Sequence, residues 1–248
     1  MAETAQVNFD GIALGRGSLF GRVNDFVGDE ELAAGEPFTI TTVGGTAFPT
    51  TVAMEKYGVV DIVTGATEDD GHQIQDEREC FRTDEAVEQT IFCARCEIDV
   101  AGQSDLFLGL SIIDTAILAS LPTDAIGFVK DDGDAEIDVI CIRNSTSTRK
   151  NNVQALDTGT HEFAFIVEPD SDDSVNATIH WYIDGRLVHK FVPNATLADN
   201  ESQCDDNPHD EELSRSVAVL NGASAAVTLS LDLLGAWIYS PNGRQPSL

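Results

Sequence analysis

From residue 37 onward, apolar and polar side chains alternate along the chain with a period close to two. Segments 37–43, 58–64 and 89–100 show the pattern and are rich in β-branched and aromatic residues. Successive side chains of a strand lie on opposite faces, so this alternation predicts half-buried strands. Helical periodicity is scarce, and only 83–88 and 114–120 are candidates for one or two helical turns.

Asp132-Gly133 predicts a two-residue hairpin turn between two such segments. This turn would place Phe128 opposite Ile137 on an apolar face. The other face, which includes Asp138, would be mostly solvated, as in a sandwich strand.

Asn221-Gly222 similarly links 216–220 to the clearest alternation in the chain, at 227–233. The four apolar residues Val227, Leu229, Leu231 and Leu233 would share one face. Many strands with turns at short spacing, and no alternation with helices, predict an all-β antiparallel sandwich or barrel.

The chain divides into two regions by composition. Residues 36–248 carry the strand pattern and predict one β-sandwich domain, interrupted by an acidic loop at 195–213. Residues 1–35 are rich in Gly and lack periodicity. We interpret them as an extended arm that lies on a neighbouring subunit; a first strand followed by coil is the alternative.

Four residues of the arm are our candidates for anchoring contacts: Arg16, Leu19, Phe20 and Arg22. Two cations and two large apolar side chains would have no use in a solvated tail. They would suit an arm that binds a capsid protein or another subunit.

Charge narrows the range of partners. The chain has 43 Asp and Glu against 14 Lys and Arg, a formal net charge of -29. Phosphates would be repelled, so nucleic acid is not an expected partner. Such a surface is typical of proteins that work in concentrated salt, although an acidic mesophilic surface is the alternative.

No feature of the sequence predicts export or membrane insertion. The N-terminus lacks a basic region followed by an apolar run, and no segment is long and apolar enough for a membrane span. Five cysteines leave at least one thiol unpaired, so we expect reduced cysteines in a protein made in the cytoplasm.

Two pairs of residues are candidate metal ligands. Cys93 and Cys96 resemble a ligand pair, but three residues apart in a strand they point to opposite faces, and we expect Cys96 in the core. A two-residue turn at 184–185 would set His180 opposite His189, half of a metal or pH-sensitive site. Without a third ligand, a neutral hydrogen-bonded or solvated pair is the better interpretation.

Acidic clusters offer oxygen ligands for calcium, foremost Asp131, Asp132, Asp134 and Glu136. None matches an EF-hand spacing, and clusters arise by chance in so acidic a chain. We therefore expect no cofactor, with calcium the one metal left open.

Pairs of carboxylates also catalyse the hydrolysis of glycans in glycosidases. The pairs Glu97 with Asp99 and Glu136 with Asp138 resemble an acid-x-acid-x-x-acid strand but lack its last carboxylate. No Ser-His-Asp, P-loop or dinucleotide signature is present. We expect no catalytic residues.

Six segments together resemble a family of tailed-phage virion proteins with a concanavalin A-like or laminin G-like jelly-roll fold. They are 107–115, 124–133, 140–148, 161–168, 181–188 and 231–238. The resemblance spans about 37–240 and leaves out the arm and the acidic loop. It implies a decoration, cement or turret protein on the capsid exterior.

The first function hypothesis is therefore a non-enzymatic virion protein that binds the major capsid protein and itself, with a trimer favoured. The second is carbohydrate recognition by a lectin-like or adhesin module. Trp237, beside Tyr239 at a strand end, could be an aromatic platform for a glycan, although a core position is more typical of Trp.

We expect the melting temperature to rise strongly between low and molar NaCl, because cations would screen the repulsion among carboxylates. Thermal melts across this salt range measure the effect. A flat response would contradict the inference of a saline habitat without affecting the predicted fold.

Overall fold

The computed structural model describes residues 18–26, 38–44, 54–55, 58–84, 86–170, 176–193, 197–223 and 225–240. These residues form sixteen strands and one short 3₁₀ helix, η1 (Ala101–Gln103). No helix among them is long and apolar enough to cross a membrane.

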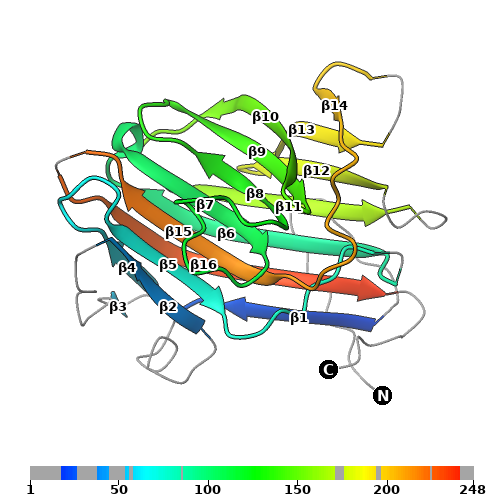
Figure 1. The fold of residues 1–248 in the computed structure, drawn as a ribbon, viewed down its shortest axis with the longest axis horizontal. Coiled ribbons are helices and arrows are strands. Elements are labelled where there is room, and N and C mark those ends of the chain that lie inside the picture. Colours follow the sequence, from blue (N-terminus) through cyan, green and yellow to red (C-terminus); the bar gives the residue numbers. More distant parts are fainter. Residues whose placement is uncertain are drawn as a thin grey trace.

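The strands form two sheets that pack face to face (Figure 1). The nine-stranded sheet contains β1 (Ser18–Asn24), β3 (Met54–Glu55), β4 (Val59–Val63), β6 (Gln89–Ile98), β11 (His161–Pro169), β12 (Ala177–Ile183), β13 (Arg186–Val192), β14 (Glu201–Gln203) and β16 (Thr228–Ser240). The seven-stranded sheet contains β2 (Phe38–Val43), β5 (Gly71–Asp76), β7 (Ser104–Ser111), β8 (Ala125–Lys130), β9 (Glu136–Arg143), β10 (Thr146–Ala155) and β15 (Ser214–Asn221).

All described pairings are antiparallel except that of β13 with β14. The predicted all-β antiparallel sandwich is confirmed. Part of the predicted acidic loop forms a strand, since β14 adds to the edge of the nine-stranded sheet.

Aromatic side chains from both sheets meet in the core. Phe128 on β8 packs edge-on against Trp181 on β12, with ring centroids 5.1 Å apart. Trp181 also contacts Phe165 at 5.1 Å and Phe191 at 5.7 Å. Such contacts stabilise a core beyond the burial of area alone.

A buried ion pair also lies between the sheets. Arg215 on β15 donates to both carboxylate oxygens of Asp76 on β5, from Nε at 2.9 Å and from Nη2 at 2.7 Å. Its Nη1 donates at 2.9 Å to the carbonyl of Leu234, which belongs to β16 in the opposite sheet. The guanidinium stacks over Phe38, 5.0 Å from the ring centroid. One side chain thus connects the two layers.

Residues 18–24 of the predicted arm form a first strand, which was the alternative interpretation of 1–35. They form β1 and pair with β16 of the same sheet, from Ser18 opposite Ser240 to Asn24 opposite Leu234. This part of 1–35 therefore belongs to the sandwich. Gly21 permits the pairing, because a Cβ there would lie 2.1 Å from the indole of Trp237.

The Asp132-Gly133 turn is longer than predicted. Strand pairing sets Phe128 opposite Val139, not Ile137, and 131–135 forms the connection. A shift of two residues keeps each side chain on its predicted face, so Phe128 and Ile137 both remain in the core.

We expected the outer face of this hairpin to be mostly solvated, but it is buried. Val129, Ile140 and Ile142 are buried together with Ile117. The segment around Ile117, which connects β7 to β8, covers this face. Gln73 binds this segment, since its Oε1 accepts from the backbone N–H of Ile117 at 3.0 Å.

Asn221-Gly222 does not form a hairpin. β15 and β16 lie in different sheets, and the segment between them crosses the edge of the sandwich. A bulge between Leu231 and Leu233 then changes the phase of β16, so Leu234 replaces Leu233 in the core.

The described residues of the two predicted helical segments, 83–88 and 114–120, lie in turns and bends and not in helices. Asp84 accepts from the N–H of Ala86 at 3.1 Å, and Asp114 accepts from the N–H of Ala116 at 3.0 Å. Short-range bonds of this kind compete with helix formation.

We expect Asp76→Ala to lower the free energy of unfolding by about 3–5 kcal/mol, because it leaves the Arg215 guanidinium buried without its anion. Urea unfolding in molar NaCl measures the loss. The double variant Asp76→Leu with Arg215→Met should recover a large part of it, since no buried charge remains. Equal losses in the single and double variants would contradict this account.

Candidate functional site

The predicted contact residues take part in the sandwich as far as they are described. The ring of Phe20 lies 6.2 Å from that of Phe81 at the edge of the core. Arg22 Nη1 lies 3.7 Å from Asp76 Oδ1. Leu19 pairs with Tyr239 through the backbone, and Arg16 lies outside the described residues.

The acidic cluster at 131–136 does not converge on a point. Asp131 binds Arg149 at 2.5 Å, and the backbone N–H of Asp132 donates to Asp105 at 2.7 Å. Among the described residues, no group of three or more His, Cys, Asp or Glu side chains is arranged to hold a metal, and this includes Asp134 and Glu136.

Three of the four carboxylates considered for hydrolysis bind groups of the protein itself. Asp138 accepts from Arg149 Nε at 2.6 Å and from the backbone N–H of Asn152 at 2.7 Å. Asp99 accepts from the N–H of Thr228 at 2.7 Å, and Glu97 from Thr160 Oγ1 at 3.1 Å. The fourth, Glu136, is half-buried on β9.

The two histidines do not face each other. The 184–185 turn forms as predicted, with Tyr182 opposite Leu187, but a bulge follows and sets His180 opposite Lys190. His189 is buried, and burial lowers the pKa of its imidazole to about 4. Its Nε2 lies 3.0 Å from Ser202 Oγ on β14.

The cysteines lie as predicted on opposite faces of β6. Cys96 is in the core, whereas Cys93 belongs to a smaller cluster on the outer face with Ile91, Ile166 and Trp237. Burial raises the pKa of both thiols to about 12. Trp237 is 7% exposed, as expected of a packed Trp and not of an open glycan platform.

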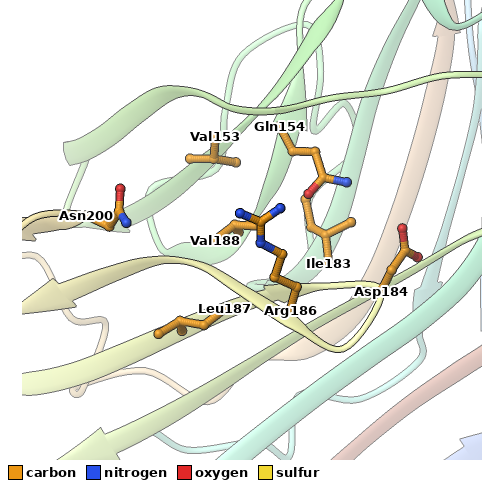
Figure 2. A pocket seen from close by; sticks show the side chains of 8 residues that line it. All are labelled: Val153, Gln154, Ile183, Asp184, Arg186, Leu187, Val188 and Asn200. Atoms are coloured by element: carbon orange, nitrogen blue, oxygen red, sulfur yellow. The ribbon is translucent and has the colours of Figure 1, made fainter.

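A pocket of about 490 Å³ lies at one end of the sandwich, between β10 and the β12–β13 hairpin (Figure 2). Side chains from both sheets and from the start of the acidic segment line it. They are Val153, Gln154, Ile183, Asp184, Arg186, Leu187, Val188 and Asn200.

Figure 2 shows the guanidinium of Arg186 directed across the pocket toward β10, which carries Val153 and Gln154. Asp184 lies at the other end of the hairpin turn. It is held by His161, whose Nδ1 lies 2.8 Å from Asp184 Oδ2. Partial burial lowers the pKa of His161, but its hydrogen bonds to Asp184 and Asp157 outweigh this and raise it.

The sequence identified the hairpin turn at 184–185 but not this pocket. Arg186, Gln154 and Asn200 come from three separate elements, and no spacing in the sequence relates them. Only the packing of β10 over the hairpin brings them together.

No protein-family model and no curated protein matches this chain. Solved structures do. The metal-free carbohydrate recognition domain of Emp46p matches with a TM-score of 0.54 at 10% identity, over 89% of this chain and 95% of that chain. The CBM2 module of the evolved Dit protein of Lactobacillus casei BL23 phage J-1 matches with a TM-score of 0.51 at 10% identity, over 88% and 95%.

The laminarinase catalytic domain from Thermotoga maritima MSB8 matches with a TM-score of 0.52 at 13% identity, over 88% of this chain and 96% of that chain. The similar structures thus include carbohydrate-binding modules, one of them from a phage, and a glycosidase. At such identities the likeness shows the fold alone. That fold is the jelly-roll sandwich that the sequence predicts.

We expect the stability of the sandwich to fall as the pH drops from about 6.5 to about 4. In this window His189 stays neutral in the folded chain but gains a proton in the unfolded chain, so acid favours unfolding. Urea unfolding of the wild type and of His189→Gln, which can still bond to Ser202, measures the contribution of His189 to the pH dependence of the free energy of unfolding. The variant should lose less stability over this window, and an identical pH dependence would contradict the prediction.

Proposed function

We propose that this chain is a non-enzymatic structural protein of a tailed virus that decorates or cements the capsid exterior. Its partners would be the major capsid protein and copies of itself, with a trimer favoured. The observation that carries the non-enzymatic part of the proposal is that Asp138, Asp99 and Glu97 each accept hydrogen bonds from other groups of the protein. Carboxylates held in this way stiffen a scaffold and are poorly placed to cleave a glycan.

The sequence resemblance to tailed-phage virion proteins and the fold shared with a phage module favour the same role. The net charge of -29 fits a particle surface exposed to concentrated salt and disfavours a nucleic acid partner. The protein would be made in the host cytoplasm and would act on the virion.

β1 is the best-placed contact surface. Among the described strands its one partner is β16, and we propose that a strand of a partner binds along its other edge. Val23 on this strand is 49% exposed, and the side chain of Arg22 is 31% exposed. The proposed contact therefore consists of β1 and the segment before it, which includes Arg16.

Carbohydrate recognition is the second candidate function. The observation that favours it is the pocket beside the β12–β13 hairpin, in a fold shared with a carbohydrate recognition domain and a CBM2 module. The two functions are compatible, because β1 and this pocket involve different residues.

The capsid proposal predicts that the purified protein sediments with empty capsids of the virus that encodes it, in molar NaCl. Removing residues 1–17, which leaves β1 intact, or introducing Val23→Asp should abolish sedimentation without lowering the melting temperature. Leu121→Asp changes another exposed apolar side chain and should bind normally. A wild type that stays in the supernatant, or variants that sediment as the wild type does, would overturn the proposal.

A further inference from the structure

Arg186 differs from most cationic side chains in this acidic protein. Among the described residues, Arg22, Arg82, Arg95, Arg149, Lys190 and Arg215 each bind a carboxylate. Arg186 has no such partner, and its guanidinium is directed into a pocket (Figure 2). A planar fork of donors in this position can bind an incoming carboxylate through two hydrogen bonds.

The turn that precedes Arg186 fixes the backbone from which its side chain projects. Asp184 and Gly185 have φ values of 52° and 71°, as a tight two-residue hairpin turn requires. Arg186 then pairs directly with Ile183 across the hairpin. Asp184 is further fixed by the backbone N–H of Glu162, which donates at 2.9 Å. The pocket therefore has a preorganised wall.

The remaining lining suits a molecule with both apolar and hydroxyl-bearing faces. Val153 and Val188 are half-buried and pack against the core, so they form an apolar floor with the buried Ile183 beneath it. Gln154 and Asn200 add amide donors and acceptors at the rim, and Asp184 adds an acceptor. The exposed lining is more polar than apolar, which suits a ligand rich in hydroxyl groups.

We propose that this pocket binds a saccharide that carries a carboxylate, such as a uronic acid unit of a glycan. Arg186 binds the carboxylate, the amides of Gln154 and Asn200 bind hydroxyl groups, and the apolar floor contacts the C–H face of the sugar ring. A single guanidinium, with the Asp184 carboxylate at the other end of the turn, suits a ligand with one negative charge in the pocket better than a more highly charged anion. This inference rests on the carbohydrate-binding candidate function.

Isothermal titration calorimetry with trigalacturonic acid and its methyl ester tests the inference, because the two probes share a backbone and differ in charge. We expect the full-length protein to bind the acid at least about tenfold more tightly than the ester. Arg186→Ala should remove that preference, whereas Arg78→Ala should keep it. Arg78 is an exposed arginine outside the pocket that also lacks a carboxylate partner among the described residues.

A glycan array that carries neutral and uronic acid oligosaccharides separates the two levels of the proposal. Binding of neutral glycans that is unaffected by Arg186→Ala would overturn the ligand class but leave carbohydrate recognition standing. Failure to bind any glycan on the array would overturn both. Equal binding of the acid and its ester by the wild type would also overturn the ligand class.

Discussion

The charged group buried between the two sheets constrains how they can be arranged. Arg215 satisfies its charge with Asp76 on a neighbouring strand and donates a further hydrogen bond to the carbonyl of Leu234 in the opposite sheet. Layers that slide past each other would lose this bond and the packing of Phe128 on Trp181. These contacts fix how the two sheets pack on each other, and both of our proposals concern the edges and ends of the sandwich.

Both proposed recognition surfaces lie at such margins. β1 adds to the nine-stranded sheet beside β16, where the ring of Trp237 lies against Gly21. The pocket lies where β10, from the other sheet, approaches the β12–β13 hairpin. Arg186, a cation without a carboxylate partner in an acidic protein, follows a fixed turn, and it is the residue that we propose selects the ligand.

Local patterns predicted the strands and most of their faces. The core face of β6 and the separation of Cys93 from Cys96 follow from a period of two, which does not depend on distant partners. The predicted register at Asp132-Gly133 was wrong by two residues, and a shift of two leaves every side chain on its predicted face. The predicted pairing of His180 with His189 failed because one extra residue in β13 changes which side chains face each other.

The sequence alone determined the fold class, the surface charge and the turn at 184–185, since each depends on residues close together in the chain or on composition. Three features were decided only by tertiary structure: the crossing from β15 to β16, the covered outer face above Ile117, and the meeting of Gln154, Arg186 and Asn200 at one pocket. Each of these joins segments far apart in the chain. Hydrophobic periodicity records which face of a strand is buried, but it carries no information about which distant segment buries it.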